Sequence, residues 1–235
     1  MEPVAAARAL VEERFPECLA AFVAGSVIEG RGTRSSDLDM VIITVEEEAP
    51  YRESLIYEGW PVELFVHTTE SYLHYFESDA KSRMPALPTM CLGTILVDRD
   101  GTAAKARSDA ETLLLKGPEA PTEDELASMR YALTDLLDDF LDVTDRQQAA
   151  FVAQALSEGS ATLILTVRGK WSGKAKWLAK ALDAGCPGLS ERLVGCLRSF
   201  WREGDKEPLA SFAQMALNEA GGRLWEGYRQ GGKRK

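Results

Sequence analysis

The chain has few of the residues that hold small secreted or metal-bound domains together. It contains only four cysteines and two histidines among its 235 residues. No two of the cysteines form a CxxC pair, so we expect neither a structural zinc site nor a disulfide framework. Their positions are Cys18, Cys91, Cys186 and Cys196. This usage is typical of a reducing compartment, and we expect a cytoplasmic protein.

Long apolar runs and excess positive charge are also missing. No apolar run reaches the ~18–20 residues that a membrane helix needs. The N-terminus lacks the basic start and apolar core of a signal peptide, so we expect no membrane partner. The net charge of −10 would repel a phosphate backbone, so we expect no nucleic-acid partner. A local nucleotide site, or a cationic small molecule, remains compatible with this charge.

What the sequence does contain is enough for two folded domains. The hydrophobic fraction of 45% excludes disorder as the main state. The first half alternates helical and β-branched stretches, which indicates an α/β domain. We predict helices over 4–14, 69–79 and 103–115, and strands over 19–24, 38–45, 61–67 and 93–97.

A glycine- and proline-containing linker separates this half from an all-helical one. The linker covers residues 116–121 and places the domains at 1–117 and 118–235. Thr122 with Glu125 three residues later predicts a capping box at a helix start. Only helical periodicity follows, with helices predicted over 122–144, 147–167, 174–184, 188–203 and 206–226.

The stretch from Gly25-Ser26 to Asp37-Leu38-Asp39 carries the strongest chemical signal. Strand alternation places Asp37 and Asp39 on one face, two residues apart. Two carboxylates so close repel each other unless a cation lies between them, and their hard oxygens suit Mg²⁺ or Mn²⁺. Glu63, in the middle of another predicted strand, would complete a triad if the two strands are neighbours. An edge-strand glutamate facing water is the alternative.

This pattern resembles the nucleotidyltransferase superfamily that includes DNA polymerase beta. Gly25-Ser26, ten further residues, Asp37-Leu38-Asp39 and then Glu63 carry the resemblance, with Gly30 and Ser36 also matching. It implies a mixed sheet in the first domain and a helical bundle in the second. It also implies that Asp37, Asp39 and Glu63 are catalytic residues holding two Mg²⁺ ions.

The same resemblance implies that ATP or another nucleoside triphosphate is a co-substrate. Gly25, Ser26 and Ser36 would bind its phosphates. Arg34, in the connecting loop, would neutralise phosphate charge, or else serves only as an exposed, solubilising arginine.

The helical half resembles antibiotic nucleotidyltransferases of the kanamycin and streptomycin type more loosely. The similar segment runs over residues 170–178. It implies that Lys174 and Lys176 contact the nucleotide phosphates. The alternative is a solvated helix start whose lysine stems cover Trp171 and Trp177. A P-loop is excluded, because the segment follows a helix and has the wrong glycine spacing.

Four carboxylates lie on one face of the first helix after the linker, at positions i, i+3, i+4 and i+7. They are Asp135, Asp138, Asp139 and Asp142. Like charges at this spacing destabilise a helix slightly. A cationic acceptor such as an aminoglycoside would supply the missing positive charge. A purely solvated acidic face is the alternative.

The sequence therefore predicts transfer of a nucleoside monophosphate, AMP in the first place, to a hydroxyl of a small molecule, with release of pyrophosphate. Two alternatives remain open: a protein-modifying nucleotidyltransferase of toxin–antitoxin type, and a non-catalytic nucleotide-binding relative. The acceptor, the nucleotide base, the general base and the oligomeric state are not specified by the sequence.

Overall fold

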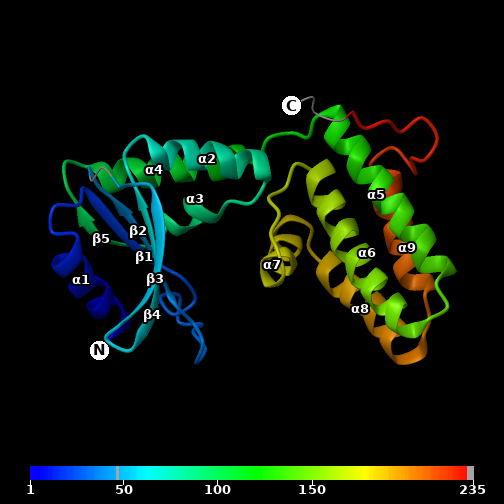
Figure 1. Cartoon of the computed structure of the whole chain (residues 1–235), viewed down its shortest axis with the longest axis horizontal. Helices are drawn as coiled ribbons and strands as arrows, with labels where there is room; N and C mark the ends of the chain where they lie inside the picture. The colour runs from blue at the N-terminus through cyan, green and yellow to red at the C-terminus, as the bar shows by residue number, and fades with distance from the viewer. Residues whose placement is uncertain (46–47, 232–235) are drawn as a thin grey trace. The chain divides into compact units, whose positions relative to one another are not determined.

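A computed structural model describes residues 1–45 and 48–231, which form nine helices and five strands. The chain divides into two compact units, Met1–Pro118 and Glu119–Lys235. The division lies one residue after the boundary expected from the linker. Figure 1 shows the sheet and its helices in the first unit and helices alone in the second.

A five-stranded mixed sheet forms the centre of the first unit, in the order β3-β4-β2-β1-β5. The pairing of β2 with β4 is parallel, and the other three pairings are antiparallel. The predicted mixed α/β sheet is thus confirmed. The strands are β1 Ala20–Ala24, β2 Leu38–Ile43, β3 Tyr51–Tyr57, β4 Trp60–His67 and β5 Thr94–Asp98.

Strand alternation divides the sheet's side chains between two apolar layers. On β2, Met40 and Ile42 are buried in the layer that contains α1, whereas Val41 and Ile43 are buried in the layer that contains α2, α3 and α4. Figure 1 shows α1 on the opposite side of the sheet from these three helices. The helices are α1 Pro3–Arg14, α2 Ser71–Ser82, α3 Ala86–Met90 and α4 Thr102–Lys116.

The strand β3 was not predicted from the sequence. It is an edge strand that alternates half-buried and exposed residues, so it lacks the apolar run that marks the inner strands. Glu58 and Gly59 join it to β4 in a two-residue turn, with φ of 49° and 83°. Two positive φ values are typical of the type I′ hairpin turn, whose twist matches that of the strands.

The described part of the second unit, up to residue 231, consists of five helices, and an apolar cluster that includes Leu137, Phe140 and Leu156 lies between them. They are α5 Glu123–Asp142, α6 Arg146–Val167, α7 Lys176–Gly185, α8 Leu189–Glu203 and α9 Glu207–Glu219. The predicted capping box is confirmed: the Glu125 N–H donates to Thr122 Oγ1 at 3.1 Å, and the Thr122 N–H donates to Glu125 Oε2 at 2.9 Å.

One predicted helix end was wrong, and one short helix was missed. The last helix ends at Glu219 rather than near residue 226, because Gly221 and Gly222 follow with positive φ. The short helix α3 was not predicted, since Pro85 and Pro88 flank and interrupt its sequence.

Among the described residues, α6 alone is long and apolar enough to cross a membrane. Half of its apolar stretch is buried inside the unit, which is typical of a core helix.

Candidate functional site

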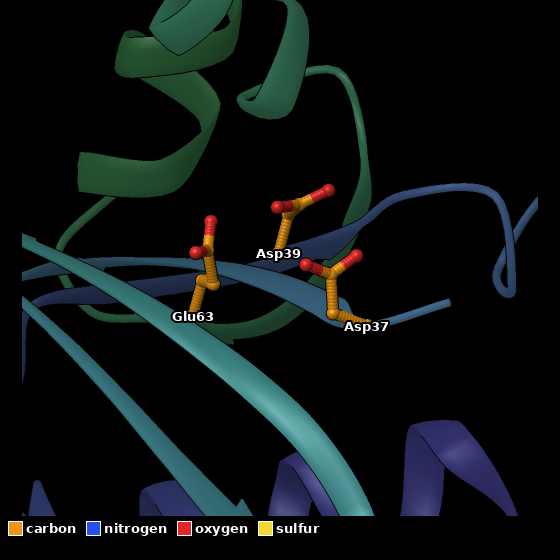
Figure 2. A group of neighbouring side chains, drawn as sticks. All are labelled: Asp37, Asp39 and Glu63. Carbon is orange, nitrogen blue, oxygen red and sulfur yellow. The ribbon is translucent and has the colours of Figure 1, made fainter. Parts of the chain in front are cut away.

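Three carboxylates converge on one face of the sheet in the first unit. Asp37 directly precedes β2, Asp39 lies on β2, and Glu63 lies on β4. The parallel register pairs Asp39 with Glu63, so strand alternation directs both side chains to the same face. Carboxylate oxygens from the three residues lie within 4.8 Å of one another. Figure 2 shows the three side chains rising from the sheet side by side.

The three acids lie on a part of the sheet face that is less covered than the part next to it. Two residues further along the same face, Val41 on β2 is fully buried and Phe65 on β4 packs against the helical layer. Asp37, Asp39 and Glu63 are only half-buried. The acids therefore lie where the layer of α2, α3 and α4 covers the sheet less completely, and their side chains stay partly exposed.

Gly25 brings the backbone close to this cluster. Its φ is +100°, a conformation that L-residues with a side chain rarely adopt. A Cβ built on it would lie 2.9 Å from Asp39 Oδ2 and 3.3 Å from the Asp37 carbonyl oxygen. Both the conformation and the space therefore require glycine at this position.

A single helical turn follows Gly25 and ends in a Schellman motif. The Arg31 N–H donates to the Ser26 carbonyl at 2.8 Å, and the Gly30 N–H donates to the Val27 carbonyl at 3.2 Å. Gly30, with φ of +71°, occupies the left-handed position that this motif needs. The turn folds the connecting loop back toward β2.

Two predicted phosphate-binding serines meet at the ends of this loop. Ser26 Oγ donates to Ser36 Oγ at 2.9 Å, and Ser36 Oγ accepts from the Thr33 N–H at 2.8 Å. Ser26 follows Gly25 and Ser36 precedes Asp37, so both hydroxyls belong to segments that enter the acid cluster. Arg34 lies exposed in the turn between them, while the neighbouring Arg31 pairs with Glu29.

The three acids fit a divalent cation of the Mg²⁺ or Mn²⁺ class. All three offer hard carboxylate oxygens, and these are close enough to share one cation or a pair of cations. Without positive charge nearby, three carboxylates at this spacing would repel each other. Their half-exposed position leaves room for oxygen ligands from water or a substrate.

Arg52 is a site residue that the sequence reasoning missed. It lies on β3, and its Nη2 donates to both carboxylate oxygens of Glu63, at 2.6 and 2.7 Å. Its guanidinium carbon lies 5.0 Å from the centre of the Phe65 ring. The Glu58-Gly59 turn is the signal for the hairpin, whose register places Arg52 opposite Phe65 and therefore on the same face as Glu63.

The two predicted phosphate-binding lysines lie exposed in the second unit, around the start of α7. Lys176 Nζ lies 5.8 Å from the Trp177 ring centre, and Lys180 Nζ lies 3.9 Å from it. Both ammonium groups thus lie near the exposed Trp177 ring, and the alternative, in which lysine stems cover Trp171 and Trp177, stays open. A phosphate role for Lys174 and Lys176 stays a prediction.

The acidic face of α5 is partly neutralised by a distant arginine. Asp135, Asp139 and Asp142 are exposed, whereas Asp138 forms an ion pair with Arg223. The segment after α9 therefore supplies a cation to an acid cluster that has no lysine or arginine among its own residues. An acceptor role for these four acids stays a prediction.

That segment is held along α5 by further hydrogen bonds. Arg130 donates to the carbonyls of Gly221 and Gly222 at 2.9 Å each, and the Leu224 N–H donates to Thr134 Oγ1 at 3.1 Å. The Tyr131 ring stacks on Tyr228, with ring centres 4.1 Å apart.

No family model and no curated protein matches the chain. Among solved structures, it is similar to a nucleotidyltransferase-like protein from Exiguobacterium sibiricum 255-15. The two are 14% identical with a TM-score of 0.44, over 93% of this chain and 73% of the other. Similarity at this level does not identify the reaction, so the function is inferred below from the geometry of the site.

Proposed function

We propose that this chain is a metal-dependent nucleotidyltransferase that transfers a nucleoside monophosphate, in the first place AMP from ATP, to a hydroxyl of a small molecule. One observation carries the proposal. Carboxylate oxygens from three acids, carried by two adjacent parallel strands, lie within 4.8 Å of one another. Beside them lies Gly25, a position that has no space for a side chain. A loop that served only to connect two strands would need neither the three clustered acids nor a glycine beside them.

Asp37 and Asp39 are the residues that would hold two Mg²⁺ ions, with Glu63 a ligand of one of them. Bound there, the ions would neutralise triphosphate charge and lower the pKa of the acceptor hydroxyl. The role of the chain is to fix the three carboxylates on a rigid sheet, so that little reorganisation is needed when the substrates arrive.

Gly25, Ser26 and Ser36 form the proposed phosphate-binding loop. Because Gly25 has no side chain, the backbone beside Asp39 stays open to phosphate oxygens. The hydroxyls of Ser26 and Ser36 already bond to each other, and either can turn to donate to a phosphate. Arg34 is exposed on the same loop and would add positive charge near the terminal phosphates.

The proposed reaction is an in-line displacement at the α-phosphorus. The acceptor oxygen forms the new bond to phosphorus, and the bond from phosphorus to the bridging oxygen of the leaving group breaks. Pyrophosphate departs with that electron pair, and the hydroxyl proton leaves to solvent or to a carboxylate of the chain. The chain contributes by aligning the acceptor with the phosphorus and excluding competing geometries.

A cationic acceptor, of the aminoglycoside class, is the finer part of the proposal. Its support is the net charge of −10 and the exposed carboxylates Asp135, Asp139 and Asp142 on α5. Long-range attraction of a polycation to such a surface would raise its rate of encounter.

The test is mass spectrometry of acceptors incubated with Mg²⁺ and each of the four nucleoside triphosphates. The panel should include aminoglycosides, neutral sugars and polyols, with the protein fraction analysed too. We expect a product heavier by one nucleoside monophosphate with wild type and with Glu53→Gln, but not with Asp39→Asn. Glu53 is the matched control, because it lies on the same sheet but pairs with Arg14 of α1.

Two results would change the conclusion. Modification of protein, with no small-molecule product, would favour the protein-modifying alternative. Equal product from wild type and Asp39→Asn would place the chemistry elsewhere and overturn the proposal.

A further inference from the structure

The Arg52–Glu63 ion pair opposes the metal site that the proposed function requires, and the inference drawn from it rests on that function. Glu63 is a proposed metal ligand, yet both of its oxygens accept from Arg52 Nη2. A cation ligated by Glu63 would lie about 2.0–2.1 Å from a carboxylate oxygen. Arg52 and the metal therefore compete for the same two oxygens.

The exposed position of the Arg52 side chain allows it to leave Glu63. Its side chain is 60% exposed, against 25% for Glu63, so displacing it from Glu63 buries no uncompensated charge. Both hydrogen bonds to Glu63 converge on one guanidinium nitrogen, so the other two nitrogens are not committed to that carboxylate.

The Phe65 ring provides a support that does not depend on Glu63. Phe65 is two residues beyond Glu63 on the same face of β4, and the Arg52 guanidinium carbon lies 5.0 Å from its ring centre. A guanidinium held over an aromatic face keeps part of its attraction when its carboxylate partner is taken away. Arg52 would therefore remain beside the site after leaving Glu63.

Triphosphate is the partner that would then attract Arg52. A planar guanidinium donates two parallel hydrogen bonds to a phosphate, a geometry that its single-nitrogen contact with Glu63 does not use. The phosphates of a nucleotide bound through the metal would lie close to Glu63, the carboxylate that Arg52 contacts. Arg52 would exchange one anion for another without leaving the open face of the sheet.

We propose that Arg52 is an exchangeable counter-cation: it holds Glu63 in the metal-free protein, and it transfers to the triphosphate when metal and nucleotide bind together. The consequence is coupling. Metal alone must displace Arg52 with no new partner for it, and so binds weakly. Metal with nucleotide supplies that partner. By linkage, nucleotide strengthens metal binding by the same factor by which metal strengthens nucleotide binding.

The test is calorimetric titration of Mn²⁺, with and without an ATP analogue whose α,β-bridging oxygen is replaced by a methylene. Arg52→Gln is compared with Arg14→Gln, which removes the same charge and breaks the Arg14–Glu53 pair on the other face of the same strand. Arg52→Lys keeps the charge but loses the planar fork. Thermal unfolding verifies that each variant is folded.

We expect Arg52→Gln to bind Mn²⁺ alone about 5–10-fold more tightly than wild type, and the Mn²⁺-bound analogue about tenfold more weakly, within the usual range of coupling between sites. Arg52→Lys should restore weak Mn²⁺ binding but recover only part of the analogue affinity. Arg14→Gln should change neither affinity by more than about twofold, as expected for an exposed pair.

Each contrary outcome has its own meaning. Unchanged or weaker Mn²⁺ binding by Arg52→Gln would overturn the competition. Tighter Mn²⁺ binding with unchanged analogue affinity would overturn the transfer to triphosphate. If wild type binds no Mn²⁺ even with the analogue present, or if Asp39→Asn binds it as wild type does, the metal site itself fails, and with it the proposed function.

Discussion

Clustered charges have different surroundings in the two units. In the first unit, the β2–β4 register holds Asp37, Asp39 and Glu63 together, and one exposed arginine provides the counter-charge. In the second unit, some members of the charge clusters along the sequence pair with residues from distant segments instead. Arg168 forms two hydrogen bonds to Glu219, at 2.9 and 2.7 Å, and Asp138 pairs with Arg223.

The difference shows which charge patterns can be interpreted from sequence alone. Neighbouring strands fix side chains on one face of a sheet, so an Asp-x-Asp and a glutamate on the next strand are brought together by the backbone. A helix presents its charges to whatever segment folds against it. Arg168, at the end of α6, is an example, because it pairs with Glu219 at the end of α9.

The largest expected effect concerns whether the two units fold independently of each other. Phe140 is fully buried in the second unit, and its ring centre lies 5.2 Å from that of Phe200. We expect Phe140→Ala to destabilise that unit by about 3–5 kcal/mol. Mn²⁺ affinity at the triad should stay unchanged under conditions where the second unit has begun to unfold, as followed by circular dichroism. A parallel loss of Mn²⁺ binding would show that the units are coupled.

Turnover should differ almost as strongly between variants of the acid triad in the first unit and variants of the acidic face of α5. Asp37→Asn removes a proposed metal ligand, and we expect turnover to fall by about 10²–10³-fold, as for loss of a key electrostatic group. Asp142→Asn, on α5, should leave turnover with a saturating acceptor within about twofold. Steady-state pyrophosphate release measures both. Similar losses of turnover in the two variants would place chemistry on α5 as well.

Gly25 tests whether the backbone positions the acids. Gly25→Ala forces a Cβ into a strained conformation 2.9 Å from Asp39 Oδ2. We expect a loss of about 1–3 kcal/mol in the free energy of unfolding of the first unit, together with weaker Mn²⁺ binding because the Asp39 carboxylate must move. Gly59→Ala is the control, since its added Cβ meets nothing within 4 Å although its φ is +83°. It should lose stability but retain Mn²⁺ affinity.

The stability of the two units should also depend differently on pH, because both histidines belong to the first unit. Burial lowers the pKa of His67 to about 4. The unfolded chain therefore binds a proton below about pH 6.5 that the folded unit takes up only near pH 4, so stability falls as pH decreases through this window. Between pH 7 and pH 5 we expect the first unit to lose about 2 kcal/mol.

Replacing His67 by Gln should flatten that pH dependence, and urea unfolding at each pH measures it. The second unit should respond only at lower pH. Arg168 lowers the pKa of Glu219, so this pair contributes stability that is lost as pH falls through the range of that carboxylate. An equal loss of stability in both units between pH 7 and pH 5 would contradict the contribution of His67.

The smallest effects are expected on the acidic face of α5. If it attracts a cationic acceptor, Asp139→Asn should weaken aminoglycoside binding about two- to threefold at low salt, with little effect at high salt. Arg223→Gln should do the opposite, because it frees Asp138 from its ion pair. Calorimetry at two salt concentrations compares them. No change in either variant would indicate that the face serves only solvation.

Much of the fold could be predicted because the inner strands carry apolar, β-branched runs. Leu38–Ile43 is an example, and the Thr122 capping box similarly marked a helix start. What escaped prediction lies at edges and ends. The strand β3 is half-exposed, and the segment after α9 lies along α5 through single contacts such as that of Arg130 with Gly222.

The candidate site was predictable to the same extent. The three acids follow from strand alternation and a spacing that resembles a known family. Arg52 does not, because its contact with Glu63 depends on a hairpin whose strand carries no apolar run. Contacts made by an edge strand or a chain end depend on tertiary folding rather than on local pattern.

The parallel pairing of β2 with β4 also makes the site a sensor of strand alignment. Residue 39 lies opposite residue 63 in that pairing. If β4 slipped by one residue, Glu63 would turn into the apolar layer beneath α1, and Val62 or Leu64 would take its place beside Asp39. One residue added to β4 directly before Glu63, or removed from there, would favour such a slip. Divalent-cation affinity would then report misaligned strands in molecules whose overall helix and strand content is unchanged.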